Sequence, residues 1–282
     1  MPLATTADLV TAARAKGRAV GAFNVITLEH VEAVMRGAES VGLPVIIQVS
    51  ENAVRFHAGQ LNPLARAAAA AAELSTVPVA LHLDHVTQLA LLYQAFDGGF
   101  SSAMFDAGAA PYDQNVAATQ AAVEWAHGHG LWLEAELGYV GGKPDAPISA
   151  HTPGTRTDPH EAAEFVKVTR VDALAVAVGS SHAMTTRTAT LDQALICRLA
   201  AAVTVPLVLH GSSGVADADL VSAVGAGIGK VNIGTALNIA YTRAIRQFLD
   251  SDAQVVDPRK YLNGARDSAA EVVAAVLRVI SG

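Results

Sequence analysis

Short, mostly apolar segments alternate along this chain with longer segments in which apolar residues recur at helical spacing. Strands that are buried on both faces of a parallel sheet appear in a sequence as continuous apolar runs. Longer stretches with a period near 3.6 residues, rich in alanine, indicate amphipathic helices. We expect strands at residues 21–25, 44–49, 78–83, 102–105, 131–137, 172–178, 206–210 and 230–233.

Helical patterns fill the intervals between these strands, so the chain is built from repeated strand–helix units. Strands that alternate with helices predict βαβ units and a parallel sheet. Eight strands without an intervening linker favour one (β/α)8 TIM barrel domain over residues 1–282, although alternation alone also permits an open doubly wound sheet. We expect an additional N-terminal helix and a C-terminal helical extension over residues 257–280 around helices at 28–41, 61–74, 89–97, 112–129, 161–168, 191–201 and 216–225.

Composition narrows the class of protein. Hydrophobic residues make up 51% of the 282 residues and charged residues 16%, against about 25% charged in an ordinary soluble chain, which excludes a disordered protein. The net charge of −7 argues against a nucleic-acid binder, and no apolar run approaches the ~18 residues of a membrane span. The single cysteine, Cys197, excludes an internal disulfide framework, and the N-terminus lacks the apolar core of a signal peptide. We therefore expect a cytoplasmic protein without nucleic-acid or membrane partners.

Three histidines lie at or just beyond the ends of three of the predicted strands: His85, His182 and His210. In a barrel of this type, catalytic groups lie where the strands end and the βα loops begin. A single histidine in such a place is usually a hydrogen-bonded loop or core residue, but three would meet at one mouth of the barrel. Three histidine ligands with an open fourth position are typical of a catalytic zinc site.

Carboxylates lie near the same strand ends. Asp106 and Glu136 either orient the histidines or hold a metal in a second position. Asp84 directly precedes His85 and is placed for proton transfer to a substrate. Lys230 lies on the eighth predicted strand, but its neighbours give no reason to expect covalent catalysis.

Two loops of small residues follow the seventh and eighth predicted strands. They comprise Gly211, Ser212 and Ser213, and then Asn232, Ile233, Gly234 and Thr235. Their backbone N–H groups and hydroxyls lie near predicted helix N-termini, which are natural anion sites. Because loops at this position in barrels commonly bind phosphate, we expect a phosphate site here.

The motifs around these residues, taken together, resemble the class II, zinc-dependent fructose-bisphosphate and tagatose-bisphosphate aldolases. The likeness extends in order from about residue 5 to the end of the chain. The motifs that carry it are Ala22-Phe23-Asn24-Val25, Leu81-His82-Leu83-Asp84-His85, Glu134-Ala135-Glu136-Leu137-Gly138, Val178-Gly179-Ser180-Ser181-His182, His210-Gly211-Ser212-Ser213-Gly214, Lys230-Val231-Asn232-Ile233-Gly234-Thr235 and Asp257-Pro258-Arg259-Lys260-Tyr261-Leu262.

The resemblance implies a homodimer or homotetramer that cleaves a ketose bisphosphate into dihydroxyacetone phosphate and an aldehyde. His85, His182 and His210 would bind Zn²⁺, and Asp106 with Glu136 would form the alternate metal position; a monovalent cation is also implied. Asp84 would protonate the aldehyde oxygen. The ligands of the phosphates and hydroxyls would be Ser50, Ala183, Gly211, Ser212, Ser213, Asn232, Ile233, Gly234, Thr235 and, toward a neighbouring subunit, Arg259.

Two positions depart from the family pattern. The loop that usually reads Gly-Gly-x-Glu-Asp here has Pro144 in place of the proton-shuttling glutamate, which leaves Asp145 as the candidate replacement. Ala183 follows His182 where the family usually has glycine. An aldolase with a different acceptor aldehyde, a non-catalytic sugar-phosphate-binding protein and a metal-dependent isomerase or epimerase are therefore the alternative functions.

Overall fold

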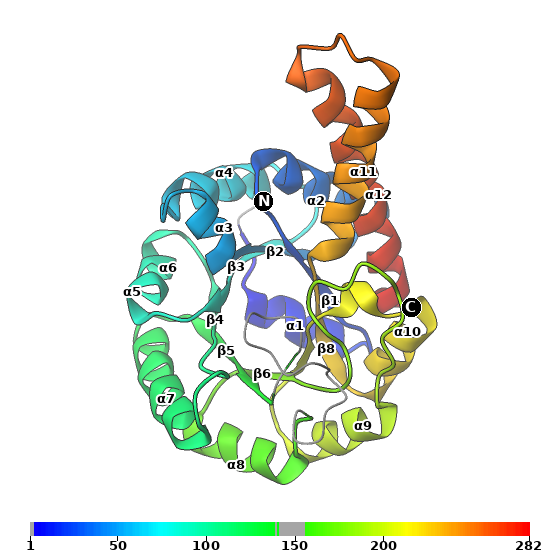
Figure 1. Ribbon diagram of the computed structural model, residues 1–282. Helices are drawn as coiled ribbons and strands as arrows, with labels where there is room; N and C mark the ends of the chain where they lie inside the picture. The colour runs from blue at the N-terminus through cyan, green and yellow to red at the C-terminus, as the bar shows by residue number, and fades with distance from the viewer. Residues whose placement is uncertain (1–2, 139, 141–155) are drawn as a thin grey trace.

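Eight parallel strands close into a barrel in this computed structural model, which describes residues 3–138, 140 and 156–282 (Figure 1). Each strand pairs with the next in sequence, and β1 pairs with β8 to close the ring, so the open sheet is excluded and the TIM barrel is confirmed. The strands are β1 Val20–Asn24, β2 Val45–Ser50, β3 Val79–Val86, β4 Ser102–Phe105, β5 Trp132–Leu137, β6 Ala173–Val176, β7 Leu207–Leu209 and β8 Ile228–Ile233.

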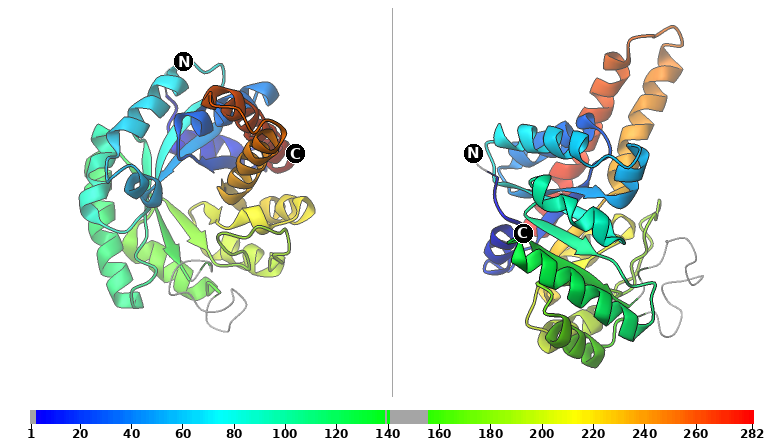
Figure 2. Two further views of the ribbon diagram at one scale, coloured as in Figure 1. Left: turned by 45° about the horizontal axis from the view of Figure 1, so that its top comes forward. Right: turned by 90° about the vertical axis from the view of Figure 1, so that its left-hand side faces the viewer.

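Helices surround the barrel between successive strands (Figures 1 and 2). Their apolar faces, with the outward faces of the strands, form the main hydrophobic core. The helices are α1 Thr6–Arg14, α2 Leu28–Val41, α3 Glu51–Phe56, α4 Asn62–Glu73, α5 Leu89–Leu92, α6 Gln94–Asp97, α7 Tyr112–Gly128, α8 Pro159–Thr169, α9 Gln193–Ala202, α10 Asp217–Ala226, α11 Thr235–Ser251 and α12 Pro258–Ser281, with the 3-10 turn η1 Ser212–Gly214.

The expected N-terminal helix, α1, covers the amino-terminal end of the barrel. Its Leu9 and Val10 pack against Val20 and Ile46 at the start of β1 and β2. Thr5 caps the helix, since its side chain accepts a hydrogen bond from the backbone N–H of Asp8 at 3.1 Å. With this end covered, the carboxyl ends of the strands form the accessible mouth of the barrel.

The helical extension at the C-terminus pairs with a helix whose bounds were not predicted. The seventeen-residue α11 follows β8, and α11 and α12 run side by side away from the barrel (Figure 2). The second half of α12 returns to the barrel and packs closely against α2, where Gly37 meets Ala270 and Val273. The short α3 was also not predicted, and the helix expected at 89–97 is divided into α5 and α6 at Tyr93. Among the described residues, no helix has the length and apolar character required to cross a membrane.

Candidate metal centre and substrate pocket

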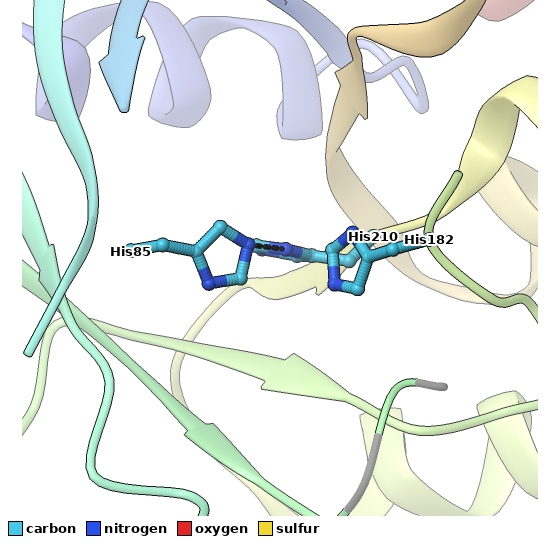
Figure 3. Close-up of side chains that lie close together, drawn as sticks. All are labelled: His85, His182 and His210. Carbon is cyan, nitrogen blue, oxygen red and sulfur yellow. Dashed lines mark hydrogen bonds between the residues drawn. The ribbon is translucent and has the colours of Figure 1, made fainter. Parts of the chain in front are cut away.

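Three histidine rings converge at the carboxyl mouth of the barrel (Figure 3). His85 lies on β3, His182 on the loop after β6, and His210 directly after β7. The ring centroid of His85 lies 5.0 Å from that of His182 and 4.8 Å from that of His210. Each ring has one nitrogen within 4.8 Å of a nitrogen of each of the other two rings. The structure therefore brings together the three histidines that the sequence singled out.

Carboxylates fix which nitrogen of two rings faces the centre. His85 Nδ1 lies 2.8 Å from Asp106 Oδ2, and His210 Nε2 lies 2.9 Å from Glu134 Oε1. An ionised carboxylate only accepts hydrogen bonds, so these two nitrogens are the protonated ones in the neutral rings. His85 Nε2 and His210 Nδ1 are then left facing each other 3.0 Å apart with their lone pairs.

This arrangement fits a divalent cation. Two nitrogens that each lie about 2.0–2.1 Å from a tetrahedral zinc ion are separated by about 3.3 Å, close to the observed spacing. Facing lone pairs on neutral imidazoles need a cation or a shared proton between them. His85, His182 and His210 are therefore residues that could hold Zn²⁺, as the sequence indicated.

Asp106 and Glu136 form a second candidate group with His85. Asp106 contacts His85 through one carboxylate oxygen and accepts the backbone N–H of Gly108 through the other, at 3.1 Å. Gly108 also lies beside Glu136, whose Oε1 would be 3.5 Å from a Cβ placed on this glycine. Asp106 thus orients a histidine, and the group is equally suited to hold an ion in an alternate position.

Asp84 is buried beside the histidines and lines the same cavity. Asn24 donates a hydrogen bond to its Oδ2 at 2.7 Å, and Gln48 in turn donates to Asn24 at 3.1 Å. Within the described part of the chain, Oδ1 of Asp84 has no hydrogen-bond partner. Burial raises the pKa of this carboxyl, but electrostatic interactions with His85, His210 and Lys230 and the Asn24 hydrogen bond outweigh burial and lower the pKa overall.

A cavity of about 380 Å³ opens in front of these groups. Its size suits a small ligand. The predicted site residues that line it are Ser50, Asp84, His85, Asp106, His182, Ala183, His210, Gly211, Ser213, Asn232, Gly234 and Thr235.

Other predicted residues lie outside this lining. Ser212 is buried and donates its hydroxyl to the carbonyl of Asn232, and Ile233 packs into the hydrophobic core. Arg259 lies at the start of α12, 89% exposed and ion-paired with Asp257, so its role toward a neighbouring subunit stays a prediction. Asp145, the candidate proton shuttle, falls outside the described residues.

The predicted phosphate loops have the backbone that close ligand approach requires. Gly211 has a φ of 66°, and a Cβ there would lie 2.5 Å from the Ser181 carbonyl oxygen, so only glycine fits this turn. Ser213 Oγ accepts the backbone N–H of Ala236 at 3.0 Å, which ties the loop to the N-terminus of α11. The positive end of that helix dipole therefore faces the cavity beside Thr235.

Sequence reasoning missed a group of residues on the β2 and β3 side of the cavity. Glu51 is buried and accepts the backbone N–H and the hydroxyl of Thr87, at 2.7 and 2.9 Å. It also forms an ion pair with Arg55. Among the described residues that line the cavity, Arg55 is the one lysine or arginine. Glu51 is the second residue after the strand predicted at 44–49, and this position was the available signal.

A closed barrel with three convergent histidines and buried carboxylates at its carboxyl mouth defines a TIM-barrel enzyme with a candidate metal centre. The sequence pattern described as "Fructose-bisphosphate aldolase class-II" matches residues 4–282. The chain therefore belongs to the class II fructose-bisphosphate aldolase family. Aldolases are carbon–carbon lyases.

Individual relatives agree with this assignment. The chain is 37% identical over 274 residues to a protein of Staphylococcus aureus named fructose-bisphosphate aldolase, covering 97% of this chain and 95% of the relative. It is 38% identical over 279 residues to a probable fructose-bisphosphate aldolase of Bacillus subtilis, covering 99% and 97%. The crystal structure of the YdjI aldolase from Escherichia coli matches with a TM-score of 0.86 and 33% identity, over 99% of this chain and 97% of that one.

Proposed function

We propose that this protein catalyses reversible, zinc-dependent aldol cleavage of a ketose 1,6-bisphosphate of the fructose or tagatose type. The products would be dihydroxyacetone phosphate and an aldehyde such as glyceraldehyde 3-phosphate. The observation that carries the proposal is the convergence of three histidine nitrogens beside the buried carboxylate of Asp84 in one cavity.

The metal would be held by His85, His182 and His210. When bound, a divalent cation supplies Lewis-acid stabilisation of the negative charge that develops as the carbon–carbon bond breaks. The pKa of Asp84 is lowered, so its carboxylate is ionised near neutral pH and accepts the proton of the substrate hydroxyl during cleavage. In the direction of condensation the same group returns that proton to the aldehyde oxygen.

The phosphate of the three-carbon fragment would bind at the turn of Gly211 to Ser213 and at Gly234 and Thr235. Backbone N–H groups and the positive end of the α11 dipole favour an anion there. Ser50, which also lines the cavity, would assist the phosphate site. Holding the fragment at one end places its reacting carbon between the histidines and Asp84, which lowers the entropic cost of reaction.

Further parts of the proposal come from the family resemblance. The enzyme would act in the cytoplasm as a homodimer or homotetramer, in which Arg259 reaches the second phosphate in a neighbouring subunit. Asp145 would serve proton transfer at the nucleophilic carbon in place of the usual glutamate. A monovalent cation near the phosphate is also part of this proposal.

The test is a cleavage assay with purified, zinc-loaded protein. Fructose and tagatose 1,6-bisphosphates are supplied, and dihydroxyacetone phosphate is measured with and without a chelator. We expect release that the chelator abolishes and that the variant His182→Ala lacks. His127→Ala is the matched control, since His127 pairs with Asp172 on the barrel exterior at 3.0 Å and should not affect cleavage. Tight phosphate-ligand binding without release from either substrate would instead identify a non-catalytic sugar-phosphate-binding protein.

A further inference from the structure

A buried ion pair lies inside the barrel, one layer below the candidate metal centre. Lys230 Nζ on β8 lies 2.8 Å from Glu134 Oε2 on β5, and both side chains are fully buried. Lys230 also donates to Asn232 Oδ1 at 2.8 Å, which leaves Asn232 Nδ2 3.1 Å from His210 Nε2. The carboxylate of Glu134 and the amide of Asn232 therefore meet at the same ring nitrogen, and the negative charge of the carboxylate favours the protonated form of Nε2. A buried ion pair contributes little net stability, because desolvation of both charges offsets their attraction, so its place in the core asks for another explanation.

The other carboxylate oxygen of Glu134, Oε1, provides that explanation. Oε1 accepts the Nε2 proton of His210 at 2.9 Å, while Oε2 is occupied by Lys230. His210 therefore presents Nδ1, and not Nε2, toward His85, 3.0 Å away. Hydrogen bonds of this kind to the outer nitrogen of a metal-binding histidine fix its tautomer and orientation.

We infer that Glu134 and Lys230 are positioning residues, which act through His210 by holding its ring in the tautomer that leaves Nδ1 available as a metal ligand. The inference rests on the proposed function, since it concerns the proposed metal centre. Lys230 has only hydrogen-bond donors, so it dictates that an acceptor atom of residue 134 faces it. With a carboxylate at residue 134, a second acceptor remains for His210.

This logic predicts an unusual response to substitution. In Glu134→Gln the side chain has one acceptor and one donor group. Lys230 takes the carbonyl oxygen, so the amide NH₂ faces His210 Nε2, as Asn232 Nδ2 already does at 3.1 Å. With no acceptor left beside it, Nε2 must then accept. The ring proton moves to Nδ1, the nitrogen that faces His85.

Removal of the lysine should reverse that effect. In the double variant Glu134→Gln/Lys230→Met, no donor at residue 230 claims the carbonyl oxygen. Asn232, which has lost its lysine donor, is no longer held with Nδ2 toward His210, so the amide oxygen of residue 134 can accept the Nε2 proton. The Nε2–H tautomer returns, so the second substitution repairs the first.

The experiment combines two measurements on the full-length protein. The tautomer of His210 is read from ring ¹⁵N and ¹H shifts of histidine-labelled, metal-free protein. Zinc affinity is measured by competition with a chelator. We expect Nε2–H in the parent protein, Nδ1–H in Glu134→Gln with an affinity about 10–100-fold lower, and recovery of both in the double variant. Asp172→Asn makes the same chemical change at the exterior His127 pair and should alter neither reading at the metal centre.

Different results separate the possible failures. An Nδ1–H ring in the parent protein, or a double variant that binds zinc no better than Glu134→Gln, would overturn the inference, because merely structural damage accumulates and is not repaired. Zinc binding with the expected tautomers but no cleavage of any ketose bisphosphate would overturn the proposed function and leave the inference standing. Circular dichroism of each variant confirms that the barrel is folded.

Discussion

Replacement of Asp84 by asparagine isolates the proposed proton transfer from the shape of the site. In Asp84→Asn the amide oxygen can still accept the hydrogen bond that Asn24 donates to Oδ2, at 2.7 Å in the parent protein. The amide NH₂ then takes the place of Oδ1, the oxygen without a partner among the described residues. The change therefore substitutes a donor for the proton acceptor and leaves the volume almost unchanged.

The expected loss can be estimated from this geometry. A positioned acid or base contributes about 10²–10⁴-fold to rate, so kcat should fall by that factor. This loss corresponds to an activation free energy that is higher by about 2.7–5.4 kcal/mol. Asn24→Ala keeps the carboxylate but removes a hydrogen bond to a charged group, worth about 1.5–3 kcal/mol, and should lower kcat less. Once Asp84 is asparagine, the further change Asn24→Ala should add little, because the two residues act as one unit.

The assay is steady-state cleavage of fructose and tagatose 1,6-bisphosphates, with zinc content measured on the same samples. We expect Asp84→Asn to retain zinc, because the three histidines are untouched. A variant that holds zinc and keeps more than about one tenth of the parent kcat would refute the assignment of proton transfer to Asp84.

Three further predictions concern packing, pH and the substrate's far end. A Cβ on Gly37 would lie 2.6 Å from the carbonyl oxygen of Ala270, so Gly37→Ala should lower the free energy of unfolding by about 1–3 kcal/mol in urea denaturation, whereas Gly225→Ala, with nothing within 4 Å, should be neutral or stabilising. Burial lowers the pKa of His30 from its model-peptide value of 6.5, so the unfolded state binds the proton more readily and the protein loses stability as pH falls below that value. His30→Gln should reduce the dependence of the free energy of unfolding on pH by up to about 1.36 kcal/mol per pH unit. An unchanged dependence between pH 6.5 and 5 would contradict this prediction. Arg55→Gln should lower kcat/KM about tenfold or more for a ketose 1,6-bisphosphate but not for a ketose 1-phosphate, since the cavity-lining guanidinium can bind the second anionic group; equal losses for both substrates would exclude that role.

Periodicity located the barrel because each strand is buried on both faces, and such strands are visible in sequence. Periodicity did not predict the bounds of helices correctly where tertiary packing overrides the local sequence pattern. The segment at 89–97 has a helical pattern, yet the helix is divided at Tyr93. Thr235 was assigned to a phosphate loop, and no bounds were predicted for α11, the helix that it begins.

The candidate site was predictable as far as strand ends specify it. His85 lies at the end of a strand and His182 and His210 follow one, and parallel strands end at one mouth. The strand period of two could also have placed Glu134 with Glu136 on one face of β5. The pairing of Glu134 with Lys230 could not be read in this way, because β5 and β8 are not neighbours and the contact depends on the closed geometry of the barrel.

One local irregularity explains how two successive residues serve the same cavity. In a regular strand, Asp84 and His85 would point to opposite faces. Instead, the pairing of β3 with β4 shifts register between Leu83 and Val86, and His85 has a φ of 51°, in the left-handed region. A bulge of this kind redirects a side chain, so both residues line the cavity.

The same backbone conformation recurs beside the second histidine. Ala183, directly after His182, has a φ of 57°. A left-handed conformation costs a residue with a Cβ about 1–2 kcal/mol, and glycine would adopt it without that cost. Glycine, the residue that the family resemblance implies at this position, suits this conformation, and the alanine here adopts it with its Cβ. At His85 the imidazole is part of the candidate metal centre, a role that glycine could not fill, and the left-handed conformation occurs at that position.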